Sequence, residues 1–334
     1  MSALRSRSAR FALIATLVGT LALTACAPRS GADDLGLTPT PAPSEVAPTT
    51  APAASTCTDV KGQVEPSYSP DSIPAGSTVA AIRESGVLRV GVSADTLLMG
   101  SRNPLTGQIE GFDIDVLHQI SSAIFGDPNR LQFVVLTSAQ RLPALTPDAS
   151  GKTQVDIVAR ALTINCARWQ SIAFSTEYYA AGQKVLVPSD SPATRIEDLQ
   201  SENAKTGEKN KVCAPAGTTT LTKLGDYPGI EPVSASTHTE CLVLFQQGKV
   251  DAITGDDTIL AGFAAQDPYA KVVGPAFSSE PYGLGMPAAS LDLVSFVNGV
   301  LDRMRADGTW TSIYNKWLSV LGPAPAPPAA VYGR

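Results

Sequence analysis

The sequence contains few of the residues that bind metals or carry out covalent catalysis. It has two histidines in 334 residues, and its five cysteines form no C-x-x-C pair, so a zinc site is not expected. No G-x-S-x-G elbow or metal-binding motif occurs, which removes the common signatures of a hydrolase. The formal net charge is −6 without a basic run, which argues against nucleic acid as a partner.

Long apolar runs are equally scarce, and the run near the N-terminus is too short for an ordinary membrane span. Residues 11–23 are apolar, follow three arginines and lead into Leu-Thr-Ala-Cys26, which resembles a bacterial lipobox. We therefore predict a lipoprotein signal peptide at 1–25 and a lipidated Cys26 that anchors the chain to the outer face of the cytoplasmic membrane. An ordinary signal peptide with an incidental cysteine is the alternative.

Segments rich in proline and alanine flank the rest of the chain. Residues 26–56 and 322–334 hold few large apolar side chains. The first is predicted to be an extended tether and the second a coil, because neither can form a core. The roughly 260 residues between them suffice for two domains.

Strand-like and helix-like segments alternate between these flanks. Strands are predicted at 87–92 and 131–136, a helix opens at Gly111 with apolar residues at helical spacing, and a second alternating block begins near Gln183. This order predicts an α/β fold with parallel sheets covered by helices on both faces. Ligands of such sheets bind outside the carboxyl ends of the strands.

The most informative segment spans 155–175. Val155 to Val158 is predicted to be a strand that ends in a turn carrying Thr163, and Arg168 follows where the next helix should begin. A helix N-terminus offers unpaired N–H groups. A threonine adds a hydroxyl, and an arginine can grip a carboxylate with two parallel hydrogen bonds. These groups together indicate a carboxylate-binding site.

The spacing T-x-x-x-x-R followed by F-S-x-x-Y-Y resembles the carboxylate clamp of type 2 periplasmic binding proteins for amino acids. The likeness extends from about Asp71 to Leu321. The segments T-I-N-C-x-R-W and D-P-Y-x-x-V-V-G are similar to those of glutamine/glutamate-binding lipoproteins of actinobacteria. This resemblance implies two Rossmann-like lobes joined by a two-strand hinge, with the ligand in the cleft between them.

The same resemblance implies how the chain divides. Lobe 1 is expected to comprise 57–181 and 281–321, and lobe 2 is expected to comprise 182–280. The crossings are expected near 180–182 and 279–281, and closure of the cleft would hinge there.

The ligand's carboxylate and ammonium each need a partner once water is excluded. By resemblance, Arg168 and Thr163 from lobe 1 and Thr219 from lobe 2 hold the carboxylate, and Asp256 holds the ammonium. Asp257 takes that role if the alignment is shifted by one residue. The set expected around the backbone of the ligand is Arg168, Thr163, Ala161, Thr218, Thr219 and Asp256.

The ligand's side chain is expected to be acidic. Ser138 and Arg141 lie in an S-x-x-R-x-P segment. It resembles the part of glutamate/aspartate-binding proteins that meets the distal carboxylate. His238 falls on a histidine that those relatives use. Each match alone is weak, and the two together favour an acidic ligand.

The chain departs from those relatives just after the first strand. They carry a further arginine there, whereas this chain has Ala94 and Asp95. Arg102 or Arg160 would then supply the missing positive charge, and an arginine would have to separate Asp95 from an anionic side chain. Glutamate, aspartate, asparagine and glutamine therefore remain open, in that order of preference.

Four cysteines remain once Cys26 is assigned to the lipid. An even number in an exported protein indicates two disulfides with three possible pairings. Cys213 and Cys241 are expected in one lobe, on a strand and a following helix. We favour Cys213–Cys241 together with Cys57–Cys166, which would tie the N-terminal extension to the core.

The favoured function is an amino-acid-binding lipoprotein, monomeric and without cofactor or metal, that closes around its ligand and delivers it to an ABC importer. A sensor that reports the ligand to a membrane signalling protein uses the same chemistry and is an alternative. A dehydratase on this scaffold would need an aimed general acid or base, for which His238, Asp95 and the acids near Asp256 are available. A structural envelope lipoprotein would need no clamp.

Overall fold

The computed structural model describes residues 67–332. The predicted signal peptide (1–25), the lipidated Cys26, the tether (26–56) and Cys57 lie outside the described residues. Within the described part, no helix combines the length and the apolarity that a membrane crossing requires.

The name lobe 1 is used here for the first sheet and the helices that cover it. This sheet has the strand order β5–β1–β6–β13–β7. Its strands are β1 (Leu88–Val92), β5 (Leu131–Val135), β6 (Ile157–Ala159), β7 (Ile172–Phe174) and β13 (Gly285–Pro287). A small antiparallel sheet joins β2 (Asp95–Thr96), β3 (Gly100–Arg102) and β4 (Ile109–Glu110).

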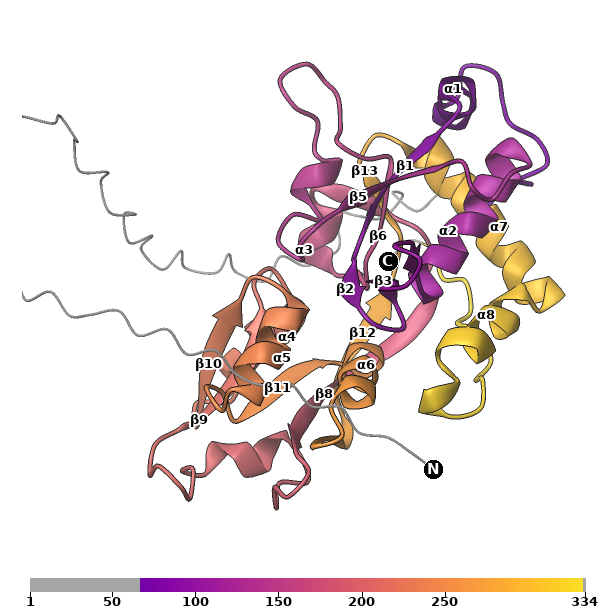
Figure 1. The fold of residues 1–334 in the computed structure, drawn as a ribbon. Helices are drawn as coiled ribbons and strands as arrows, with labels where there is room; N and C mark the ends of the chain where they lie inside the picture. Colours follow the sequence, from indigo (N-terminus) through magenta and orange to yellow (C-terminus); the bar gives the residue numbers. More distant parts are fainter. Residues whose placement is uncertain (1–66, 333–334) are drawn as a thin grey trace, which may run out of the picture. The chain divides into compact units, whose positions relative to one another are not determined.

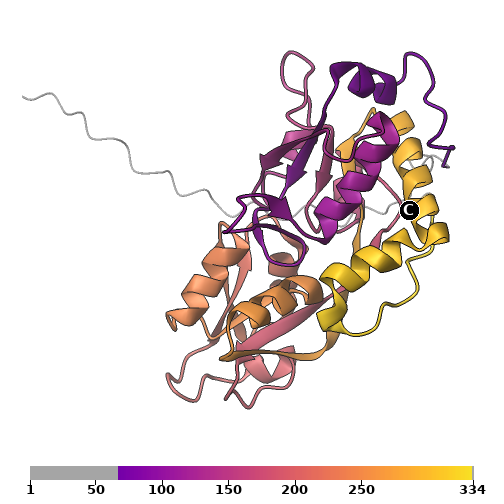
Figure 2. The same ribbon diagram turned by 45° about the vertical axis from the view of Figure 1, so that its right-hand side comes forward.

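The long helices of lobe 1 supply much of its core. In α2, Phe112, Val116, Ile120 and Ile124 are fully buried, which is the helical spacing that the sequence predicts. The C-terminal helices α7 and α8 lie beside α2 (Figures 1 and 2). The helices are α1 (Thr78–Ser85), α2 (Phe112–Phe125), α3 (Cys166–Trp169), α7 (Leu291–Asp307) and α8 (Thr309–Trp317), with 3₁₀ turns η2 (Pro143–Leu145) and η5 (Ser319–Leu321).

The name lobe 2 is used for the second sheet and its helices. The strand order is β10–β9–β11–β8–β12. Its strands are β8 (Tyr179–Pro188), β9 (Asn210–Pro215), β10 (Ile230–Ala235), β11 (Ala252–Asp256) and β12 (Ala270–Tyr282). Its helices are α4 (Thr219–Lys223), α5 (His238–Gln246) and α6 (Asp257–Gln266), with 3₁₀ turns η3 (Ile196–Gln200) and η4 (Leu224–Asp226).

Both sheets are mixed, whereas the sequence predicts parallel sheets. The pairs β1–β5, β1–β6, β9–β10 and β9–β11 are parallel. In contrast, β8 is antiparallel to β11 and β12, and β13 is antiparallel to β6 and β7. Alternation with helices constrains only strands joined by a helical crossover. The strands β8 and β13 enter their sheets directly from the other lobe, without a helical crossover, so the rule does not fix their direction. The strand β12 follows β11 through α6, and these two strands run parallel on either side of β8, as the rule predicts.

The strands β8 and β12 form the passage between the two sheets. They pair from Tyr179 opposite Tyr282 to Pro188 opposite Ala270, with a register shift between Val273 and Ser278. The crossings expected near 180–182 and 279–281 therefore face one another in a single ribbon. The exact lobe boundaries stay a prediction.

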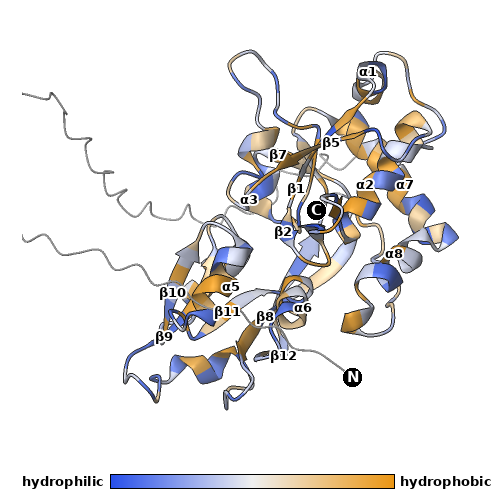
Figure 3. Cartoon of the chain, in the orientation of Figure 1, coloured by the Kyte–Doolittle hydropathy of each residue, from blue (hydrophilic) through white to orange (hydrophobic). Residues whose placement is uncertain are grey.

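The core combines apolar strands with a covalent link. Figure 3 colours much of β5 as hydrophobic, and Leu88, Val90 and Val92 of β1 are fully buried. A disulfide joins Cys213 on β9 to Cys241 on α5, the pair that the sequence favours. Cys166 is also disulfide-bonded, and its pairing with Cys57 stays a prediction because the partner lies outside the described residues.

The C-terminal tail is packed against lobe 1. Between 322 and 332 the described chain forms neither helix nor strand, as expected for the predicted coil. The Arg305 guanidinium of α7 donates to the Pro328 carbonyl at 2.9 Å, and the Tyr332 hydroxyl lies 2.6 Å from the Ser67 hydroxyl. The tail therefore returns along α7.

Candidate functional site

Arg168 and Thr163 lie on the connection between β6 and β7 of lobe 1. The Asn165 side chain caps α3 by accepting the Arg168 backbone N–H at 3.0 Å. The Arg168 guanidinium donates to the Thr163 carbonyl at 2.6 Å and to the Gly217 carbonyl of lobe 2 at 3.4 Å. Burial lowers the pKa of Arg168, and the charges of Glu280 and Asp256 oppose that shift.

The segment before α4 brings lobe 2 against this loop. Gly217 has φ +75°, and a Cβ there would lie 2.7 Å from the Ala139 Cα of lobe 1, so only glycine permits this close approach. The Thr218 hydroxyl caps α4 through the Leu221 N–H at 3.1 Å, which uses one of its lone pairs. The Thr219 hydroxyl oxygen instead lies 3.4 Å from that of Thr163.

Asp256 ends β11 with a carboxylate that is only half satisfied. Its Oδ2 accepts the Tyr282 hydroxyl at 2.6 Å, whereas its buried Oδ1 has no hydrogen-bond partner in the described part of the chain. Burial, with the negative charge of Glu280, raises the pKa of Asp256 to about 7. Asp257 starts α6, and its Oδ1 accepts the Thr258 N–H at 2.8 Å. Asp256 is therefore the carboxylate with a free buried oxygen.

Arg141 is a buried cation held only by carbonyl groups. Its guanidinium donates to the backbone oxygens of Ser138 (2.9 Å), Arg160 (3.2 Å), Ala161 (2.9 Å) and Gly217 (3.0 Å). Across residues 67–332, no carboxylate forms an ion pair with it. A buried charge without a counter-ion is costly, so this position favours an anion close by.

Arg160 supplies the second buried cation next to Arg141. It donates to the Ser138 hydroxyl and to the Leu136 carbonyl, both at 2.7 Å, and its Nη2 lies 3.6 Å from Asp95 Oδ1. Burial raises the pKa of Asp95, but the Ser93 hydroxyl and the Arg160 charge bring it below its ordinary value. Asp95 is expected to repel an anionic ligand side chain. The positive charge of Arg160 beside it would offset that repulsion.

His238 begins α5 on the side of lobe 2 that faces this cluster. Burial lowers the pKa of its imidazole to about 3, so the ring is neutral at physiological pH. Its Nδ1 is one of four buried side-chain polar atoms without a partner among the described residues, and Asp256 Oδ1 is another. Two of the four therefore belong to residues expected around the ligand.

Glu280 is a site residue that the sequence argument missed. It lies on β12, is 3% exposed, and its Oε2 accepts the hydroxyls of Thr163 at 2.7 Å and Thr219 at 2.6 Å. Its Oε1 accepts the Ser278 hydroxyl at 2.7 Å. Glu280 lies within the lobe crossing that the sequence predicts near 279–281. Because the crossings border the cleft, an acidic residue at that position could have been recognised as a candidate for the site.

The sequence argument also missed Asp113, which contacts the turn at Ala161. Its Oδ2 accepts the Ala161 N–H at 3.0 Å and its Oδ1 accepts the Tyr178 hydroxyl at 2.6 Å. Burial raises the pKa of Asp113 to about 6. Ala161 has φ +42°, which is uncommon for a residue with a Cβ. This hydrogen bond helps to hold the strained turn that presents the Ala161 carbonyl to Arg141.

Comparison with known proteins identifies the family. Residues 88–320 match the model of the bacterial extracellular solute-binding proteins, family 3. The chain belongs to this family. The two mixed sheets and the matches below also confirm the predicted α/β periplasmic binding protein fold.

Two relatives of this family 3 protein have binding functions in their names. It is 33% identical over 242 residues to the ABC transporter glutamine-binding protein GlnH of Bacillus subtilis (strain 168), covering 72% of this chain and 84% of the relative. It is 31% identical over 252 residues to the glutamate-binding protein GluB of Corynebacterium glutamicum, covering 72% of this chain and 81% of the relative.

A solved structure is similar as well. The ancestral amino acid-binding protein AncCDT-1, a precursor of cyclohexadienyl dehydratase, matches with a TM-score of 0.63 at 30% identity, covering 72% of this chain and 99% of that one.

Two expectations about the clamp of this family 3 protein need correction. The helices α3 and α4 have four and five residues, so their dipoles add less to anion binding than full helices would.

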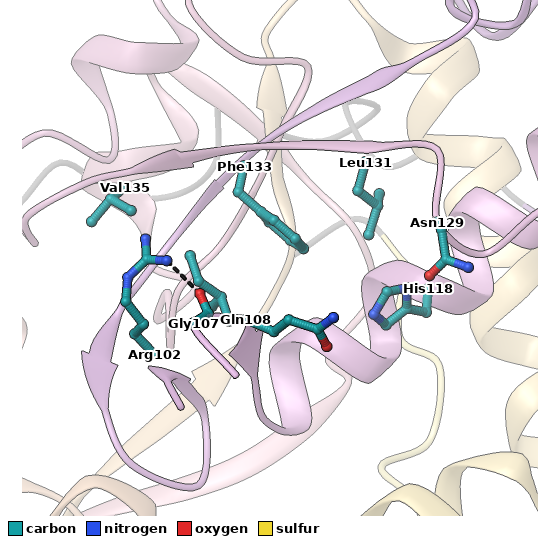
Figure 4. Close-up of a pocket in the computed structure, with 9 residues that line it drawn as sticks. Arg102, Gly107, Gln108, His118, Asn129, Leu131, Phe133 and Val135 are labelled. Carbon is teal, nitrogen blue, oxygen red and sulfur yellow. Dashed lines mark hydrogen bonds between the residues drawn. The ribbon is translucent and has the colours of Figure 1, made fainter. Parts of the chain in front are cut away.

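The second correction concerns Arg102, which lies apart from Arg168 and Arg141. Arg102 is exposed and donates to the Gly107 carbonyl. It lines a separate hollow of ≈ 360 Å³ beside β5, with His118, Leu131 and Phe133 (Figure 4). Arg160, rather than Arg102, joins the buried cluster.

Both lobes line a hollow next to Arg168. Arg168 and Asn165 contribute from lobe 1, and Thr219, Lys223 and Glu280 contribute from lobe 2 and the ribbon, around ≈ 560 Å³. No group of three or more His, Cys, Asp or Glu side chains within 67–332 is arranged to hold a metal ion. The arginines, carboxylates and hydroxyls of this family 3 protein that lie here are suited to recognising charged groups.

Proposed function

We propose that this protein binds an L-α-amino acid with an acidic side chain, L-glutamate or L-aspartate, outside the cytoplasm and delivers it to an ABC importer while tethered through lipidated Cys26. Relatives named for glutamine and glutamate binding support this proposal, as does the family to which the chain belongs. Their names describe binding, so the proposal includes no chemical conversion of the ligand.

One observation carries the proposal: two buried groups of opposite charge are incompletely matched in the same cluster. Asp256 Oδ1 has no hydrogen-bond partner among the described residues, and Arg141 donates to carbonyls without a carboxylate partner there. The ammonium of an amino acid can pair with Asp256, and the carboxylate of an acidic side chain can pair with Arg141. Arg168 and Thr219 would hold its α-carboxylate.

Closure of the lobes would couple binding to transport. Arg141 and Arg168 of lobe 1 both reach the Gly217 carbonyl of lobe 2, and the Thr239 hydroxyl donates to the Asp95 carbonyl at 3.2 Å. A ligand held by both lobes shifts the population towards such an arrangement, because its contacts are complete only there. The importer would then distinguish loaded from empty protein by shape.

The ligand class is tested by calorimetric titration of ligand-stripped protein with L-glutamate, L-aspartate, L-asparagine and L-glutamine. We expect the two acids to bind more tightly than the two amides.

Replacing Arg141 with alanine tests the side-chain pocket. Arg141→Ala should weaken binding of L-glutamate by roughly 100-fold, and binding of L-glutamine by much less, because an unpaired carboxylate would then be buried. Arg102→Ala is the matched control and should leave both affinities unchanged. Normal L-glutamate binding by Arg141→Ala would contradict the proposed side-chain pocket.

Affinity should also depend on pH through Asp256. Burial and Glu280 raise its pKa to about 7, so the carboxylate is protonated below that value and cannot pair with an ammonium. Because binding favours the ionised form, affinity should fall by about tenfold for each pH unit below 7, and protons should be released on binding. Titrations between pH 5 and 8 in buffers of different ionisation enthalpy measure both effects.

The control for this pH dependence is Asp256→Asn. This variant should bind weakly at every pH and should lose the dependence near pH 7. Asp113, whose pKa is raised to about 6, would leave a smaller dependence at lower pH. An unchanged profile in Asp256→Asn would assign the titration to another group.

A further inference from the structure

The carboxylate of Glu280 occupies an unusual place in this site. Its Oε2 accepts hydrogen bonds from Thr163 of lobe 1 and Thr219 of lobe 2, at 2.7 and 2.6 Å. These are the two hydroxyls that the sequence assigns to the α-carboxylate of the ligand. Each hydroxyl has one proton to donate, so Glu280 and a ligand carboxylate cannot both receive it.

The position of Glu280 is built by the surrounding chain. Ser278 donates to its Oε1 at 2.7 Å, and the Ser278 hydroxyl also lies 3.0 Å from Gln183 Oε1 on the neighbouring strand. Gln183 is fully buried and donates to the Thr220 carbonyl at 3.0 Å. The hydrogen bond from Ser278 thus helps to fix this carboxylate on the β8–β12 ribbon, between the two lobes, and the Ser278 hydroxyl itself lies against the side chain of the buried Gln183.

We propose that Glu280 is a built-in competitor for the α-carboxylate of the ligand, which bridges Thr163 and Thr219 and holds the two lobes together until a ligand takes over these hydroxyls. This inference rests on the proposed function, because it assumes an α-carboxylate at Arg168. In this proposal Glu280 lowers the affinity for the ligand. The ligand must replace the charge-assisted hydrogen bonds that Glu280 already makes, so the free energy of binding is less favourable than the ligand's own contacts would give.

The experiment compares Glu280→Gln with the parent protein. A neutral amide accepts hydrogen bonds about half as strongly as a carboxylate, so the variant should bind L-glutamate about tenfold more tightly. In ligand-stripped protein, amide hydrogen exchange of segments 138–142 and 215–221 should be faster than in the parent, because the bridge between the lobes is weaker. Glu231→Gln, an exposed acid on β10, is the matched control and should change neither measurement.

Glu280→Asp is the second variant, and it preserves the charge on a shorter side chain. It should also speed exchange in these segments, because the carboxylate no longer reaches both hydroxyls. Weaker L-glutamate binding by Glu280→Gln, with binding of the deaminated analogue glutarate unaffected, would overturn the proposal and assign Glu280 to the ammonium. Unchanged affinity and unchanged exchange would overturn it as well. If the parent protein binds no amino acid, the proposed function fails, and the exchange measurement still tests the bridge.

Discussion

Replacing Arg168 with alanine is expected to remove binding of every L-α-amino acid, with a loss of ~3 kcal/mol or more, which is roughly 200-fold in affinity. Arg168 is 7% exposed, and its guanidinium reaches carbonyl groups of both lobes. Its loss would leave the α-carboxylate without its guanidinium partner when the lobes close. The α-carboxylate is common to all amino acids, so the defect should not depend on the ligand's side chain. This differs from the expected result for Arg141.

Two variants serve as controls for this measurement. Arg168→Lys retains the charge and loses the planar fork, so it should recover only part of the affinity. Lys223→Ala removes another cation from the same hollow, one that is paired with Asp226 at 2.8 Å, and should have little effect. Binding by Arg168→Ala within threefold of the parent would show that the clamp is wrongly assigned. Calorimetry or intrinsic fluorescence measures each affinity.

The second large effect is expected on stability. Replacing both Cys213 and Cys241 with alanine should lower the free energy of unfolding by about 3–4 kcal/mol, because the disulfide closes a loop in the unfolded chain. The two residues are 28 positions apart and fully buried. Urea unfolding of parent and double variant under oxidising conditions measures the difference.

This double variant isolates one disulfide, since the bond of Cys166 remains intact. A reductant applied to the parent removes both and should destabilise it further. A change below about 1 kcal/mol in the double variant would mean that the unfolded chain is not restricted by this link. Because Cys241 shares α5 with His238, L-glutamate affinity measured on the same protein shows whether the link also positions the site.

Much of the fold could be predicted because its elements are long enough to show a period. The helix α2 shows apolar residues at helical spacing, and β1 and β5 are runs of β-branched and apolar residues. The small sheet of β2, β3 and β4 escaped prediction, since its strands have two or three residues and show no period. The strand β13 is equally short, and its direction depends on the return of the chain from lobe 2.

Three residues of the proposed site lie in local motifs that the sequence shows. Thr163 and Arg168 follow β6 and Asp256 ends β11, so each could be proposed from its own segment. Glu280 could not be found in this way, because its partners Thr163 and Thr219 are 117 and 61 residues away. Only the folded chain brings these three segments together.

The choice between Arg102 and Arg160 shows the same limit. Arg102 lies soon after the first strand in sequence and Arg160 directly follows β6, and charge alone does not separate them. The structure separates them by burial: Arg160 is 2% exposed, whereas Arg102 lies at the surface. The role of Thr218 as a helix cap was also hidden, because a threonine before a helix is equally suited to a ligand or to a backbone N–H.

The ribbon of β8 and β12 has a mechanical consequence. Since the two passages between the lobes are hydrogen-bonded to each other, they cannot bend independently, and relative rotation of the lobes becomes mainly a torsion of one two-stranded element. A single angle then describes the motion. The exposed Ala180, opposite Pro281 in that ribbon, turns with it, so an environment-sensitive dye attached there would convert ligand occupancy into an optical signal.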